Sequence, residues 1–147
     1  MRSKDQLVTA SWDCTLRFWQ LTEGRGDDDL FYERMIEHDS SVSALAVSEP
    51  NNILLFGDSE GQIQCYDIEF CSLKWTFKKY TQRVVFIKNH ESNFLASLEH
   101  TMVLLNKMGH EIIQIYVPET NGSILDFHFM NNSIAAGTPL FFISKII

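Results

Sequence analysis

Several side chains near the start of the chain have the residue types that hydrolytic enzymes use. Ser11, Asp13 and His38 could supply the nucleophile, the acid and the base of a hydrolytic triad. No glycine-flanked turn of the kind that exposes such a nucleophile surrounds Ser11. We therefore predict no catalytic site at these positions.

The other histidines offer no better chemistry. They are His90, His100, His110 and His128. Their spacing does not match that of zinc ligands, and no glycine-rich loop that could hold a phosphate occurs in the chain. The sequence thus predicts neither a metal nor a cofactor.

A pattern of strands and turns returns along the chain. Residues 7–19 read L-V-T-A-S-W-D-C-T-L-R-F-W, and residues 54–66, L-L-F-G-D-S-E-G-Q-I-Q-C-Y, form a cruder copy. In both, an apolar strand leads into a tight turn with an acidic residue, and a second strand ends on a large aromatic, which predicts a hairpin. Further copies cover residues 94–105 and 133–143. A repeat of roughly 40 residues has the length of one four-stranded propeller blade.

The segments between these hairpins predict further short strands, separated by turn residues. They cover residues 31–36, 42–48, 73–79, 83–88, 111–117 and 123–130. Residues 22–30 are polar and predict an inserted surface loop. No segment shows a helical period. The predicted fold class is all-β: a partial propeller of antiparallel four-stranded sheets, arranged as an open arc.

Residues 38–50, H-D-S-S-V-S-A-L-A-V-S-E-P, and the hairpin that follows them resemble one complete WD repeat. The resemblance implies a buried hydrogen-bond network that braces each blade. The matching members are Ser11, Asp13 and Trp19 in the first repeat, and His38, Asp58, Glu60 and Tyr66 in the second. The last three replace the family's usual serine, aspartate and tryptophan, so we expect the second network to be altered.

The register of the repeats predicts one incomplete propeller over residues 1–147, of about three and a half repeats. A partial blade covers residues 1–22, two repeats cover residues 31–68 and 73–107, and a degenerate last repeat covers residues 111–147. The strand order predicts the C-terminal half of a propeller, whose missing N-terminal half is then an expected partner. A non-functional truncated gene product is the alternative interpretation.

A narrower resemblance rests on three segments. The run A-S-W-D-C-T-L-R-F-W at residues 10–19 is followed by the long loop, by I-E-H-D at residues 36–39 and by G-D-S-E-G at residues 57–61. This series is similar to the C-terminal propeller of BEACH-domain proteins. The resemblance implies a cytosolic scaffold of membrane traffic and receptor signalling, and any other WD-repeat scaffold is the alternative.

Composition and charge argue against several other classes of protein, among them membrane, secreted and nucleic-acid-binding proteins. The chain has no apolar run long enough to insert into a membrane and no apolar segment of a secretory signal, which favours the cytoplasm. Residues 1–69 carry 14 acidic and 5 basic side chains, which disfavours nucleic acid as a partner. The cysteines Cys14, Cys65 and Cys71 follow no metal or disulfide pattern and suit reduced, packed side chains.

Basic and aromatic residues alternate in the second half of the chain. They are Lys74, Trp75, Phe77, Lys78, Lys79, Tyr80, Arg83, Phe86 and Lys88. A surface for stacked nucleic-acid bases could show this pattern. Strands whose aromatic residues face a neighbouring sheet, with basic residues at the rim, produce it as well, and we favour this second interpretation.

Loops at one rim are the expected place of function in this architecture. Trp12 stands at the tip of a turn with little to pack against in its own hairpin, and tryptophan is enriched in interface hot spots. Packing on an adjacent loop is the alternative. The residues at the equivalent position of the other hairpins are Ser59 and Leu98. The strands that begin at the same rim start at Ser41, Tyr80 and Asn121, and Arg83 follows Tyr80 closely. We predict a non-catalytic interaction scaffold that binds proteins or peptides at this rim.

The competing prediction is a hydrolase on a propeller scaffold. It requires acids or histidines that converge at the tops of successive blades, and Glu60, Glu99 and His100 are the candidates. Their unequal positions within the repeats argue against it.

Overall fold

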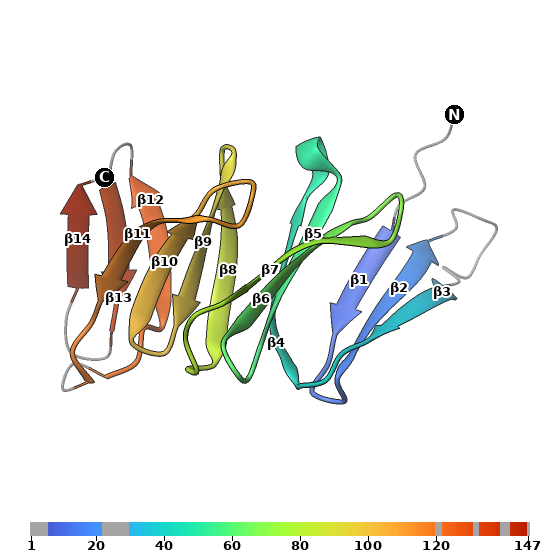
Figure 1. Ribbon diagram of the computed structural model, residues 1–147, viewed down its shortest axis with the longest axis horizontal. Helices are drawn as coiled ribbons and strands as arrows, with labels where there is room; N and C mark the ends of the chain where they lie inside the picture. The colour runs from blue at the N-terminus through green and yellow to red at the C-terminus, as the bar shows by residue number, and fades with distance from the viewer. Residues whose placement is uncertain (1–5, 22–29, 120–121, 131–132, 139–141, 147) are drawn as a thin grey trace. The chain divides into compact units, whose positions relative to one another are not determined.

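The computed structural model describes residues 6–21, 30–119, 122–130, 133–138 and 142–146 (Figure 1). Over these ranges the chain is built of β-strands and contains no α-helix. It divides into two compact units, Met1–Val42 and Ser43–Ile147, and each unit is described by itself. The all-β class predicted from the sequence is confirmed.

The first unit is a three-stranded antiparallel sheet of β1 (Gln6–Ala10), β2 (Thr15–Leu21) and β3 (Leu30–Glu37), in that order. Successive side chains of a strand point to opposite faces. On one face of β2, Leu16 and Phe18 are buried, and the guanidinium of Arg34 lies 4.3 Å from the centre of the Phe18 ring. The hairpin of β1 and β2 corresponds to the one predicted at residues 7–19.

Three sheets follow one another along the second unit (Figure 1). In each sheet, strands that are neighbours in sequence are neighbours in space. The first sheet has β4 (Val42–Ser48), β5 (Ile53–Asp58), β6 (Gln62–Asp67) and β7 (Ser72–Lys78), with the short 3-10 turn η1 (Glu49–Asn51) between β4 and β5. The second has β8 (Val84–His90), β9 (Asn93–Leu98), β10 (Thr101–Leu105) and β11 (Glu111–Tyr116), and the third has β12 (Asp126–Met130), β13 (Ser133–Gly137) and β14 (Phe142–Ile146).

The middle sheet of the second unit buries both faces, because its strands carry apolar residues at consecutive positions. In β9, Phe94, Ala96 and Leu98 belong to a core cluster shared with β5 and β6. Leu95, which points the opposite way, belongs to a second cluster shared with β12 and β13. A near-continuous apolar run is the expected pattern for a strand covered on both sides.

The first and middle sheets come closest at Gly57 of β5 and Val84 of β8. A Cβ atom on Gly57 would lie 2.5 Å from the Cβ of Val84 and 2.9 Å from its Cγ2. The hydroxyl of Ser43 lies between the two backbones, 2.6 Å from the carbonyl O of Val84 and 3.3 Å from that of Gly57. Only a residue without a side chain leaves room for this approach.

Most strand predictions agree with the structure to within two residues. The strand predicted at residues 123–130 is wrong at its start, since β12 begins at Asp126. The backbone N–H of Ile124 donates to the carbonyl O of Glu99 in the β9–β10 turn, 2.9 Å away, and so does not join a strand ladder. The loop predicted at residues 22–30 lies outside the described residues except Leu30, which opens β3.

Candidate functional site

The turn between β1 and β2 is held by the carboxylate of Asp13. Its Oδ1 accepts hydrogen bonds from the hydroxyl of Thr15 at 2.6 Å and from the backbone N–H of Thr15 at 3.1 Å. Arg17 pairs with Oδ2 at 2.6 Å, and Ser11 Oγ accepts from the backbone N–H of Asp13 at 3.2 Å. The hydrogen bond from the Thr15 side chain is the largest influence that lowers the pKa of Asp13, to about 2. The carboxylate therefore stays charged and fixes the turn.

Trp12 lies in this turn with its side chain in solvent. The residue is 73% exposed, and its carbonyl O accepts a hydrogen bond from Ser41 Oγ at 3.0 Å. The backbone N–H of Val42 donates to the neighbouring carbonyl O of Ser11 at 3.2 Å. The structure thus brings the predicted residues Trp12 and Ser41 together, and it fixes the backbone that carries the exposed indole.

The network predicted for the first repeat differs from the observed arrangement. The side chain of Asp13 is 44% exposed, so Ser11 and Asp13 bond at the surface and not in a buried position. The indole N–H of Trp19 donates to Thr9 Oγ1 at 2.9 Å, and its ring meets Tyr32 edge-on at 5.8 Å. Trp19 is therefore wrongly assigned to the network with Ser11 and Asp13, because its indole N–H bonds to Thr9, two positions along β1 from its direct cross-strand partner Leu7.

In the hairpin of β5 and β6, Asp58 takes the turn-holding role. Its buried carboxylate accepts from the backbone N–H groups of Glu60 and Gln62 at 2.9 and 2.8 Å. Glu60 itself is exposed and lies 3.6 Å from the ammonium of Lys78, so it joins no buried network, in line with the expectation that the second network is altered. Asp58 is buried, whereas the side chain of Glu60, two positions further along the chain, is exposed.

The remaining members of the second predicted network are placed separately. Tyr66 packs against Phe56 with 5.6 Å between ring centres. The backbone N–H of His38 donates to the carbonyl O of Cys14 at 2.8 Å, within the first unit.

The connection between β7 and β8 carries two of the predicted rim residues. The hydroxyl of Tyr80 donates to Glu111 Oε2 at 3.1 Å, and Lys79 Nζ lies 3.0 Å from Oε1 of the same carboxylate. Burial raises the pKa of Tyr80, and the hydrogen bond to Glu111 raises the pKa of Lys79. Arg83 lies 3.9 Å from Glu99 and is exposed. Each predicted residue is thus tied to a different acidic residue.

Three turns of the second unit touch one another and form what we call the turn surface, residues 59–61, 79–83 and 99–100. A Cβ atom on Gly61, whose φ is +81°, would lie 2.7 Å from the carbonyl O of Gln82. The backbone N–H of His100 lies 3.4 Å from Gln82 Oε1. The predicted residues Ser59, Tyr80 and Arg83 therefore belong to one continuous surface. Asn121 lies outside the described residues.

Leu98 is wrongly predicted as a rim residue. Its exposed fraction is 0%, and it pairs with Val84 as the last residue of β9. The turn that follows contains only Glu99 and His100, whereas residues 11–14 connect β1 and β2. Because the shorter turn begins later, the position aligned with Trp12 falls inside the strand.

Two of the hydrolase candidates, Glu60 and Glu99, each lie beside a basic side chain. Glu60 lies near Lys78, and Glu99 lies near Arg83. Within the described residues, no group of histidines, cysteines and acids could hold a metal ion. Over the same part of the chain, no helix has the length and apolar character to cross a membrane.

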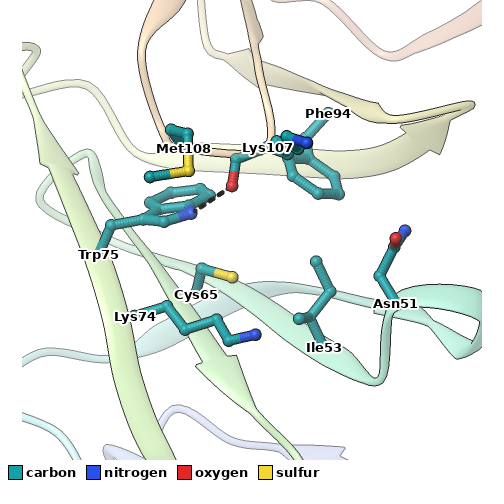
Figure 2. A pocket seen from close by; sticks show the side chains of 8 residues that line it. All are labelled: Asn51, Ile53, Cys65, Lys74, Trp75, Phe94, Lys107 and Met108. Carbon is teal, nitrogen blue, oxygen red and sulfur yellow. Dashed lines mark hydrogen bonds between the residues drawn. The ribbon is translucent and has the colours of Figure 1, made fainter.

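A pocket of about 440 Å³ lies between the first and middle sheets of the second unit (Figure 2). It is lined by Asn51, Ile53, Cys65, Lys74, Trp75, Phe94, Lys107 and Met108. The sequence does not reveal this pocket, because its walls come from strands and turns that are far apart in the chain. The alternation of basic and aromatic residues at Lys74 and Trp75 was the available signal, and the favoured interpretation holds: Trp75 packs against the core cluster while Lys74 is exposed.

One wall of this pocket is rigid. The indole N–H of Trp75 donates to the carbonyl O of Lys107 at 3.0 Å, as the dashed line in Figure 2 shows. A Cβ atom on Gly109 would lie 2.6 Å from the Trp75 ring, so the β10–β11 turn rests directly on the indole. Asn106 Oδ1 accepts from the backbone N–H groups of Met108 and His110 at 2.9 and 3.0 Å and fixes the turn. Trp75 cannot turn without breaking these contacts.

The charges around the pocket are unequal. Lys74 pairs with Asp67 at 2.9 Å, and this contact is the main cause of the lowered pKa of Asp67. Among the described residues, Lys107 belongs to no ion pair. Burial raises the pKa of the Cys65 thiol to about 11, so this side chain is neutral. As far as the described residues show, the pocket combines apolar walls with one lysine that has no acidic partner.

Comparisons with known proteins bear on the fold. No family model matches the chain, and no curated protein matches it either. Among solved structures, 856 chains match, which marks the architecture as a common one. One of them is the crystal structure of the computationally designed Ika4 protein, 16% identical, with a TM-score of 0.81 over 99% of this chain and 88% of that chain. At this identity the likeness concerns the fold alone, and the chain shares the fold of that designed protein.

Proposed function

We propose that this chain is a non-catalytic scaffold that binds proteins or peptides through its turns, and that its sheets are blades of a WD-repeat propeller. The succession of sheets, each a meander of strands adjacent in sequence, supports the propeller. An aspartate holds the hairpin turn in two of the sheets, Asp13 in one and Asp58 in the other.

The exposed indole of Trp12 is the observation that carries the binding proposal. A tryptophan with most of its surface in water has much apolar area to bury against a partner. The hydrogen bonds of Asp13 and Ser41 fix the backbone on both sides of it, so little conformational entropy is lost on binding. In the second unit, Ser59, Tyr80 and Arg83 on the turn surface are the corresponding candidates.

A peptide library displayed on phage, selected against the purified chain, tests this proposal. We expect Trp12→Ala to weaken the selected peptides about 30-fold, the effect of a hot spot of about 2 kcal/mol. The matched control is Phe70→Ala, which removes an aromatic side chain 74% exposed on the β6–β7 turn. Selected peptides that bind Trp12→Ala as tightly as the unaltered chain would contradict the proposal, as would an equal loss in Phe70→Ala.

The resemblance to BEACH-domain proteins extends the proposal to a cytoplasmic role in membrane traffic and signalling. It rests on the sequence motifs at residues 10–19, 36–39 and 57–61. Two of these contain the turn residues Asp13 and Asp58, whose hydrogen bonds give the motif a structural purpose. Localisation of the tagged chain in cells, with a marker of internal membranes, tests this extension separately from peptide binding.

A further inference from the structure

We propose that the pocket between the first and middle sheets of the second unit binds a small aromatic carboxylate. Its volume of about 440 Å³ lies within the range of roughly 300–1,000 Å³ typical of small-molecule sites. Asn51 and Lys107 place it beside the β4–β5 and β10–β11 turns, at the strand ends opposite the turn surface. The proposal does not depend on the peptide-binding function of Trp12.

The walls of the pocket select a flat apolar body. Trp75 and Phe94 stand with ring centres 6.2 Å apart and planes inclined at 43°, so they present two adjoining aromatic walls. Ile53 and the neutral thiol of Cys65 form the base between them (Figure 2). A third aromatic ring gains offset or edge contacts with such walls in addition to the burial of its surface. A sugar or another strongly hydrated ligand would lose hydrogen bonds to water that these side chains cannot replace.

The charge at the mouth selects an anion. Lys74 and Lys107 lie on opposite sides of the pocket (Figure 2). Asp67 already neutralises Lys74, whereas Lys107 has no acidic partner among the described residues. Lys107 sits on a turn that Asn106 and Trp75 hold in place, so its backbone does not have to be ordered on binding. A carboxylate one or two bonds from the ring can reach this ammonium.

Titration with naphthylacetate, followed by the NMR signal of the Trp75 indole N–H, tests the proposal. Naphthylacetamide is the neutral probe of the same shape. We expect naphthylacetate to shift the signal saturably and to bind about three- to tenfold tighter than the amide, the range expected for a partly exposed charged pair. Lys107→Gln should abolish this difference. Lys78→Gln, which removes an exposed lysine of β7 outside the pocket lining, should preserve it.

Three results would overturn the proposal. Equal affinity for naphthylacetate and naphthylacetamide would show that no cation contributes to binding. An equal effect of Lys78→Gln and Lys107→Gln would show that the contributing cation is not specifically Lys107. A Trp75 signal that responds to a short tryptophan-containing peptide but not to naphthylacetate would assign the pocket to peptide ligands instead. Trp12→Ala should bind naphthylacetate normally, which separates failure of this proposal from failure of the scaffold function.

Discussion

Substitution of Gly57 by alanine should destabilise the second unit, although alanine is the better residue for an ordinary strand. Replacing a strand glycine by alanine normally gains about 0.5–1 kcal/mol. Here the new methyl group would lie 2.5 Å from the Cβ of Val84, and both belong to backbone-anchored positions that cannot rotate away. Overpacking of this kind costs about 1–3 kcal/mol. We expect the free energy of unfolding to fall by about 1–2 kcal/mol.

Urea denaturation followed by circular dichroism measures this change, and Val84→Gly provides the control. Val84 is fully buried, so Val84→Gly alone is destabilising. In the double variant Gly57→Ala/Val84→Gly the two sheets can approach as before. Its loss of unfolding free energy should therefore be smaller than the sum of the two single losses by at least about 1 kcal/mol. Additive losses, or a Gly57→Ala variant as stable as the unaltered chain, would refute the argument that the close approach requires glycine.

Three further predictions concern single side chains. The stability contributed by the low pKa of Asp13 should be complete above about pH 4 and lost as the pH falls through about 2, and Asp13→Asn should remove this dependence from acid-unfolding curves. At about pH 8 a thiol reagent should modify the exposed Cys71 and leave the buried Cys65 intact until denaturant is added, as mass spectrometry can count. Gly109→Ala should cost about 1–3 kcal/mol and shift the fluorescence of Trp75 to longer wavelength, and an unchanged spectrum would argue against the contact between them.

The strands were predictable because their signals are local. Apolar runs bounded by turn residues give the strand type and its limits without any tertiary contact. The turn residues Asp13 and Asp58 were likewise recognisable, since each bonds to backbone groups a few positions away. The failure at residues 123–125 has a non-local cause: the amide of Ile124 is taken by Glu99 from another hairpin. Contacts of this range leave no mark in a single sequence.

The site was less predictable than the fold for two physical reasons. Leu98 falls inside a strand because the β9–β10 turn is shorter than the β1–β2 turn, and turn length decides whether a residue ends a strand or stands in solvent. Trp19 was misplaced because its type matches the motif, whereas its indole N–H bonds to Thr9, a diagonal neighbour on the paired strand. The exposure of Trp12 was predictable, since an aromatic at a turn tip has little to pack against in its own hairpin.

The close contact at Gly57 and the pocket are consequences of the same arrangement of two sheets. Where Gly57 meets Val84, the absent side chain lets the backbones approach. At the opposite strand ends, Trp75 and Phe94 fill the space between the sheets with rings that cannot pack face to face at an inclination of 43°. The pocket therefore lies at the end of the two sheets that carries Trp75 and Phe94, and the close contact at Gly57 lies toward the other end.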